Sequence, residues 1–170
     1  YSSGTSMNPI TYTAFGDGEV IVDGTGISMS SMDALIRFSE KEYLTFSNLT
    51  IQNVQDDSGE QSGVLSGSNF IISNCTFIDT GIGVWVFGES DVAIQDCSFD
   101  MANHSGYAAV RFNTVTTGLV SGNTFTNTPG VYCQGSNITV SENSITGGNP
   151  GIRVADVTTL SIDSNKIFGV

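Results

Sequence analysis

Apolar residues recur along this chain in a short phrase in which apolar and polar positions alternate around a tight polar turn. Each copy has eight positions. The first five are an apolar residue, any residue, an apolar residue, a polar residue and a turn residue. The sixth is Asn, Cys or Leu, the seventh is usually Ser, Thr or Lys, and the eighth is apolar. Five copies follow one another in register, and a looser copy precedes them: 44–51 (the looser copy), 70–77, 92–99, 118–125, 138–145 and 160–167. Alternation with a period of two is typical of strands, so each copy predicts a strand, a turn and a second strand.

Another short alternating run precedes most copies and predicts one more strand in each unit. These runs are Ile36–Phe38, Val64–Ser66, Val84–Val86, Val110–Phe112, Val131–Cys133 and Ile152–Val154. Gly-rich turns separate the units, and no unit contains a helical pattern. Repeats of roughly 20–50 residues indicate a stacked array in which each unit buries its apolar face on its neighbours.

Stacking would place like residues above one another in columns. The inward column of the last strand would read Ile51, Phe77, Phe99, Phe125, Ile145 and Ile167. At the second turn position the column reads Leu49, Cys75, Cys97, Asn123, Asn143 and Asn165. We expect the Asn amides to bond backbone groups of adjacent coils, since polar groups at a buried bend need partners.

The predicted fold is therefore an all-β parallel solenoid in one domain, residues 1–170. Residues 1–33 would form an opening coil and residues 34–170 the repeat coils. We expect six to seven coils of three strands, separated by about 4.8 Å. Neither terminus shows an amphipathic helix, so no cap is evident.

The opening segment carries a family resemblance. The stretch 4–15 (GTSMNPITYTAF), together with Val20–Gly24, resembles the entry coil of pectate-lyase-like right-handed parallel β-helix proteins. The later coils are similar to the carbohydrate-binding and sugar-hydrolase repeats of that superfamily. The resemblance implies a right-handed parallel β-helix. It implies no single activity, because that fold hosts lyases, hydrolases, epimerases, adhesins and surface-layer proteins.

Charge and composition limit the cellular locations and the binding partners that we expect for this protein. The formal net charge is −12, which repels nucleic acid phosphates and anionic membranes. No apolar run approaches 18 residues, so we expect no membrane insertion. Four Asn-x-Ser/Thr triplets begin at Asn48, Asn74, Asn103 and Asn137, candidate N-glycosylation sites that favour an extracellular or cell-surface location.

One outward column concentrates the residues most able to bind a ligand. The outward residues of the first strands are Arg37, Leu65, Trp85, Arg111, Tyr132 and Arg153. They include all three arginines and the one tryptophan of the chain. Arg grips carboxylates bidentately and aromatic rings stack on sugars, so the column could bind an acidic polysaccharide such as a uronate polymer. In the superfamily that the chain resembles, this face is the polysaccharide groove. Alternatively, these side chains stack on one another as cation–π neighbours.

Catalytic and metal-binding signals are weak. Glycosidases need two carboxylates over the groove, and no Asp or Glu points outward from the first strands. The catalytic motifs of the superfamily match at no position, so we predict no catalytic residue; an enzyme of this fold would be a polysaccharide lyase or glycoside hydrolase. Residues 56–60 could hold Ca²⁺, although their spacing matches no known calcium loop. We otherwise expect no cofactor, and a lone loop histidine, His104, is expected to be solvated.

Two cysteines occupy the same turn position in consecutive coils. Stacking would bring Cys75 and Cys97 within the Cα spacing of a disulfide, but parallel side chains stack poorly for a bridge. They are therefore either a disulfide or two buried thiols. Cys133 is expected to point inward as a buried thiol.

The strand pattern continues to both termini, so open coil ends could pair with copies of the chain. Head-to-tail contacts of this kind propagate into filaments or rings. The first functional hypothesis is therefore an extracellular structural protein that assembles end to end into a filament, sheath or surface layer. The alternative is a polysaccharide-binding or lyase-like module that acts on acidic glycans along the Arg, Trp and Tyr column.

Overall fold

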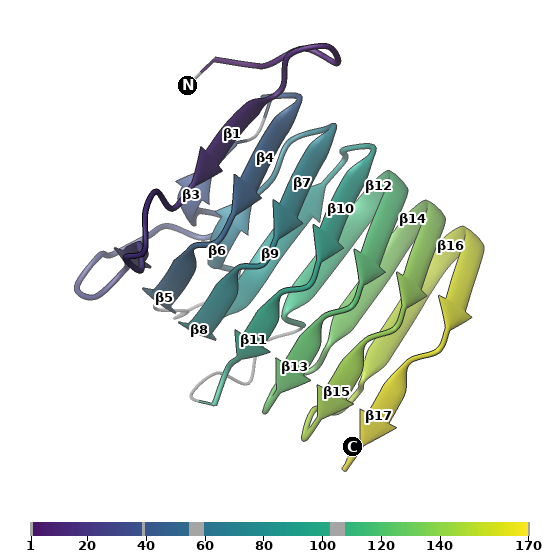
Figure 1. Cartoon of the computed structure of the whole chain (residues 1–170). Coiled ribbons are helices and arrows are strands. Elements are labelled where there is room, and N and C mark those ends of the chain that lie inside the picture. The colour runs from purple at the N-terminus through teal and green to yellow at the C-terminus, as the bar shows by residue number, and fades with distance from the viewer. Residues whose placement is uncertain (1, 39, 55–59, 103–107, 170) are drawn as a thin grey trace.

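The structure, a computed structural model, describes residues 2–38, 40–54, 60–102 and 108–169. The chain winds into a stack of parallel coils, and all paired strands run parallel (Figure 1). The opening strands and the last strands lie at opposite ends of the stack. This arrangement confirms the predicted all-β parallel solenoid.

Three kinds of strand repeat along the chain, as the alternating pattern predicts. First strands are β3 (Ala34–Arg37), β6 (Ser62–Leu65) and β9 (Ile82–Phe87). Second strands are β1 (Ile10–Thr13), β4 (Leu44–Ser47), β7 (Phe70–Ser73) and β10 (Val92–Gln95). In the later coils the first and second strands merge, giving β12 (Val110–Ser121), β14 (Val131–Ser141) and β16 (Ile152–Asp163). Third strands are β2 (Ile21–Asp23), β5 (Thr50–Val54), β8 (Thr76–Thr80), β11 (Ser98–Asp100), β13 (Thr124–Thr126), β15 (Ser144–Thr146) and β17 (Lys166–Phe168).

These strands form two continuous sheets. First and second strands share a sheet of ten strands, and third strands form a sheet of seven in the order β17-β15-β13-β11-β8-β5-β2. Where a first and a second strand merge into one long strand, the pairing is locally irregular. The register of β12 against β14 shifts in the segment from Phe112 to Val115. Counted by third strands, five coils in the described part of the chain have neighbours on both sides. The number of fully enclosed turns is thus slightly below the six to seven coils predicted.

The tight turn between second and third strands depends on a left-handed residue in each coil. Asn48, Asn74, Asp96, Gly122, Glu142 and Ser164 occupy this position with φ between 52° and 69°. Asn, Asp and Gly tolerate this backbone region better than other residues, which explains the polar turn in the repeated phrase.

The core consists of the predicted apolar columns. Phe99 lies parallel to Phe77 at 4.7 Å and to Phe125 at 4.9 Å between ring centres, and all three are fully buried. Glycine allows the first strands to approach these rings: a Cβ on Gly83 would lie 2.6 Å from the Phe99 ring. In the last coil, Ile162 and Ile167 are half-exposed because the core columns reach the end of the stack.

The opening coil has the predicted parts. β1 pairs with β4 and β2 pairs with β5, so residues 10–13 and 21–23 supply its second and third strands. The described residues contain no helix that could cross a membrane.

Candidate functional site on the outer face of the first strands

The predicted outward column exists in register. Arg37 pairs with Leu65, Leu65 with Trp85, Trp85 with Arg111, Arg111 with Tyr132, and Tyr132 with Arg153. Adjacent strands place these six side chains above one another along one face. We call this set the Arg–aromatic column.

The later part of the column is a continuous cation–π stack. The guanidinium carbon of Arg111 lies 4.7 Å from the centre of the Trp85 ring and 6.0 Å from that of Tyr132. The guanidinium carbon of Arg153 lies 5.6 Å from the Tyr132 ring. These distances fall within the range of favourable cation–π contacts, so the side chains stack on one another as the alternative interpretation predicted.

Trp85 is less exposed than expected for an aromatic ring that stacks on a sugar. Its side chain is only 3% exposed, and its indole Nε1 donates a 2.8 Å hydrogen bond to Asn113 Oδ1. Asn113 in turn donates from Nδ2 to Gln134 Oε1 at 3.1 Å. Trp85 therefore packs within the protein and presents little ring surface to solvent.

A cavity of about 370 Å³ lies at the early end of the Arg–aromatic column. Buried Leu65 and Trp85 form its floor, and exposed Met32 and Phe87 contribute to its walls. Arg37 also lines it and forms a 3.7 Å contact with Asp33, in which both side chains are largely solvated. An ion pair this exposed contributes little to stability.

Glu89 is the one carboxylate among the described residues that line this cavity. It accepts a 2.6 Å hydrogen bond from Ser68 Oγ. A glycosidase needs two facing carboxylates about 5–10 Å apart. The described lining of the cavity therefore combines one arginine and one carboxylate with apolar side chains, which are groups suited to binding.

A second, more open hollow of about 480 Å³ lies on the outer face of the second strands and was not predicted. Its lining includes Asp91, Thr117, Leu119, Asn137 and Thr159. Its lining is mainly hydroxyl, amide and aliphatic groups.

The turn column contains the predicted amide ladder. Asn143 donates from Nδ2 to the carbonyl oxygens of Val120 and Ser141 at 3.0 and 2.9 Å. Its Oδ1 accepts from the backbone and side-chain nitrogens of Asn123 at 2.9 and 3.0 Å. Asn165 repeats this pattern one coil later, with bonds to Val140, Asp163 and Asn143. The amides thus hold consecutive coils together at the bend.

Cysteine replaces Asn in the earlier coils of the same column. The Cys97 thiol lies 3.2 Å from the carbonyl oxygen of Gln95, and the Cys75 thiol lies 3.4 Å from that of Ser73. Both are free and buried, so the candidate disulfide Cys75–Cys97 is not formed in this structure. Parallel stacking accounts for this, because each thiol points at a carbonyl as the Asn amides do. A hydrogen bond with Cys75 and burial both raise the pKa of the Cys97 thiol.

Cys133 is fully buried, as predicted, and burial raises the pKa of its thiol to about 12. It lies on the inward side of β14 and has no access to reagents while the coil is intact. We therefore assign it a packing role.

The other candidate residues are partly described. Asn48, Asn74 and Asn137 are exposed, so three of the four candidate glycosylation sites are accessible. Asn103, His104 and residues 56–59 of the possible Ca²⁺ loop lie outside the described residues. The described residues contain no group of three metal-ligating side chains.

Several residues of the face were not predicted. Phe87, Asn113 and Gln134 follow the Arg–aromatic column on the same side of the sheet, and Met32 and Glu89 reach it from turns. The signal for Phe87 was its position two residues after Trp85, which places both on one face of β9. Met32 and Glu89 gave no such signal, since turn residues follow no period.

Comparison with known proteins agrees with this architecture. The family model described as the right-handed beta helix region matches residues 13–167. No curated protein and no solved structure matches the chain. The match covers nearly all of the coils described above and agrees with the resemblance noted in the opening segment. The chain therefore belongs to the right-handed β-helix family.

Proposed function

We propose that the protein is a structural β-helix that associates end to end with copies of itself through its two terminal coils. The observation that carries this proposal is the apolar surface on the last coil. Val154, Ile162, Ile167 and Phe168 are between 41% and 57% exposed there. Exposed apolar residues that gather on one surface mark sites of association.

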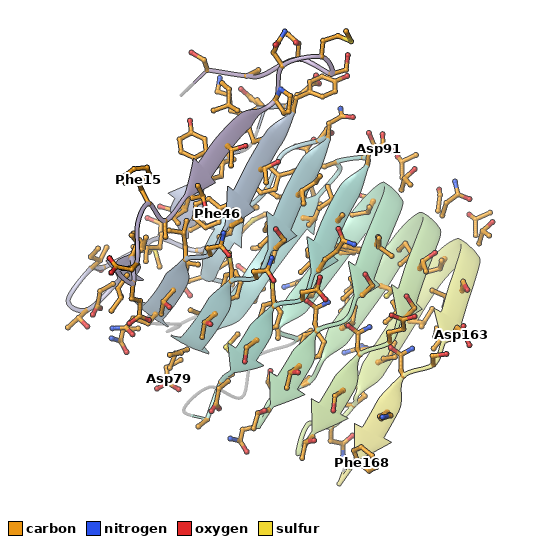
Figure 2. All side chains as sticks on the ribbon, viewed as in Figure 1. Phe15, Phe46, Asp79, Asp91, Asp163 and Phe168 are labelled. Carbon is orange, nitrogen blue, oxygen red and sulfur yellow. The ribbon has the colours of Figure 1, made fainter. Side chains whose placement is uncertain are left out.

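The opposite end of the stack offers a complementary surface. Phe15, Val20 and Ile21 are exposed in the opening coil, and Phe15 and Phe168 project at opposite ends of the molecule (Figure 2). Continuing the observed register would place Leu160 and Ile162 over Ile10 and Tyr12 of a second copy. Apolar residues would then meet apolar residues, as they do between adjacent coils within the chain.

Backbone hydrogen bonds would join the same ends. β1 and β16 end the row of second strands, and β2 and β17 end the sheet of third strands. Strand edges of this kind readily pair with another chain. A contact between two different ends of identical molecules propagates into a filament, or into a ring if it closes.

Charge opposes this contact and makes it dependent on salt. The net charge of −12 means that copies repel one another. Salt shortens the screening length to about 8 Å at physiological ionic strength, which weakens this repulsion. Association should therefore strengthen as salt is raised from low values.

The exposed glycosylation candidates support an extracellular or cell-surface location. There, end-to-end association would build a filament, sheath or surface layer. No metal or other cofactor is needed for it.

The test compares the wild-type chain with two Ile→Glu variants by electron microscopy and light scattering. Ile162→Glu places a charge on the end surface. Ile71→Glu is the matched control, because Ile71 is 42% exposed on the lateral face of the second strands. We expect polymers from wild type and Ile71→Glu and monomers from Ile162→Glu, with circular dichroism confirming that both variants are folded.

A monomeric wild type at about 100 µM and moderate salt would overturn the proposal, since a contact that weak would be worth less than about 5.5 kcal/mol. If a longer gene product stays monomeric while residues 1–170 polymerise, coils of the same polypeptide cover the surface and the proposal also fails.

A second candidate function is binding of an acidic polysaccharide along the Arg–aromatic column, with lyase or hydrolase activity as its enzymatic form. The observation that favours it is the register that aligns Arg37, Arg111 and Arg153 on one face. The burial of Trp85 counts against it. Uronate oligomers should bind the monodisperse Ile162→Glu protein and lose affinity on Arg153→Gln together with Tyr132→Ala. Unchanged binding, or none to either protein, would exclude this function.

A further inference from the structure

We propose that the cavity over Leu65 and Trp85 is a binding site for a small bipolar molecule, with a carboxylate at one end, an ammonium group at the other and an apolar ring between them. The site lies on the lateral face of the stack. It therefore does not depend on end-to-end association.

The size of the cavity suits one small organic molecule. Its volume is about 370 Å³. A cavity of about 150 Å³ already accepts benzene, and sites for small ligands usually span roughly 300–1,000 Å³. A single ring with short substituents at both ends matches this space.

The floor and walls suit an apolar ring. Leu65 and Trp85 are buried beneath the cavity, while Met32 and Phe87 remain 48% and 54% exposed beside it. Phe87 stands edge-on to Trp85, with 6.5 Å between the ring centres and an interplanar angle of 86°. A ring placed between Met32 and Phe87 would remove apolar surface from water, which is the main source of affinity in such sites.

Opposite charges lie on either side of this apolar floor. Arg37 belongs to β3 and Glu89 follows β9, and β6 lies between these two strands. Two strand spacings separate β3 from β9 by about 10 Å. A carboxylate at Arg37 and an ammonium group at Glu89 would each gain a charge-assisted hydrogen bond, whereas a ligand with one charge would form only one of these two bonds.

The chain provides its own reporter for the test. Trp85 is the only tryptophan and lies in the floor of the cavity, so changes in intrinsic tryptophan emission report on this site. The probes are para-(aminomethyl)phenylacetate, which carries both charges, and phenylacetate and para-methylbenzylamine, which carry one each. We expect the bipolar probe to bind about tenfold more tightly than either singly charged probe, the smallest gain expected from one added charged hydrogen bond.

Two variants assign the charges, and a third is the matched control. Arg37→Gln should lower the affinity for the bipolar probe about tenfold and leave that for para-methylbenzylamine unchanged. Glu89→Gln should have the same effect on the bipolar probe and leave phenylacetate unchanged. Arg153→Gln removes an exposed arginine of the same column far from the cavity and should change none of the three affinities. The Ile162→Glu background keeps the protein monodisperse in all measurements.

Three results would overturn the proposal. The first is an unchanged Trp85 emission with the bipolar probe at up to about 10 mM, which is weaker than millimolar binding. The second is equal affinity for all three probes. The third is equal loss of affinity in Arg37→Gln and Arg153→Gln. None of these results bears on polymer formation, so failure here is distinguishable from failure of the proposed end-to-end association.

Discussion

Arg111 lies between the rings of Trp85 and Tyr132, with its guanidinium carbon 4.7 Å from the first ring centre and 6.0 Å from the second. The two aromatic residues come from neighbouring strands on either side of β12. One cation therefore joins three consecutive coils on the outer face of the first strands.

Replacing Arg111 should loosen this face. Cation–π contacts that are partly shielded from water contribute roughly 1–2 kcal/mol, so Arg111→Gln should lower the free energy of unfolding by about that amount. Urea unfolding followed by tryptophan emission measures it. Arg153→Gln is the control, because the more exposed Arg153 stacks on Tyr132 alone. Equal losses in the two variants would show that the position of Arg111 between two rings adds nothing.

Gly83→Ala should destabilise the protein, whereas Gly18→Ala should not. A Cβ on Gly83 would lie 2.6 Å from the Phe99 ring and 2.9 Å from the carbonyl oxygen of Ala109. Phe99 cannot move aside because Phe77 and Phe125 stack on it at 4.7 and 4.9 Å. Overpacking of this kind costs roughly 1–3 kcal/mol. No atom would lie within 4 Å of a Cβ on Gly18. Thermal melting of both variants tests this, and similar melting temperatures would contradict the tight packing of the Phe column.

Asn143→Asp should make stability depend on pH. A carboxylate there would face the carbonyl oxygens of Val120 and Ser141 instead of donating to them, so the folded state would favour the protonated acid. The folded-state pKa would then lie above the unfolded value near 4. The loss of stability should be small below that pH and should grow as pH rises through the folded-state pKa.

Chemical unfolding of Asn143→Asp between acid and neutral pH measures this dependence. Asn137→Asp is the matched control, because Asn137 is exposed and outside the ladder. Parallel pH profiles for the two variants would mean that Asn143 contributes no buried donors to the bend.

Cys133 should reduce the stability of the protein in alkali. Burial raises the pKa of its thiol from 9.0 to about 12, so the unfolded chain loses this proton at lower pH than the folded chain. The thiol therefore costs no stability below about pH 9, and stability falls as pH rises from there towards 12. Cys133→Ala should remove this contribution. Unfolding curves across the alkaline range should show a shallower decline for Cys133→Ala than for wild type, and identical slopes would contradict the assignment.

The core could be predicted well from the sequence because each coil has apolar residues at the same positions of the repeated phrase, and these must be buried. Phe77, Phe99 and Phe125 fall at one position of the repeated phrase, and only a parallel stack buries all three. The Asn column was predictable for a related reason, since amides at a buried bend need partners in adjacent coils. Register also followed, because one apolar column fixes all the others.

The candidate site was less predictable. Alternation placed Trp85 on the outer face, but its burial depends on Asn113, Arg111 and turn residues that follow no repeat. The state of Cys75 and Cys97 depended on the directions of their side chains, which Cα spacing does not determine. Met32 and Glu89 reach the cavity from turns, where sequence carries no periodic signal.

The unequal spacing of the repeated phrase has a practical consequence. Successive copies start 20 to 26 residues apart, yet Phe77, Phe99, Phe125 and Ile145 remain aligned without a slip. Residues gained or lost between the third strand of one coil and the first strand of the next are absorbed outside the ladders. New segments could therefore be grafted into those bends, one coil at a time, while the scaffold beneath them keeps its shape.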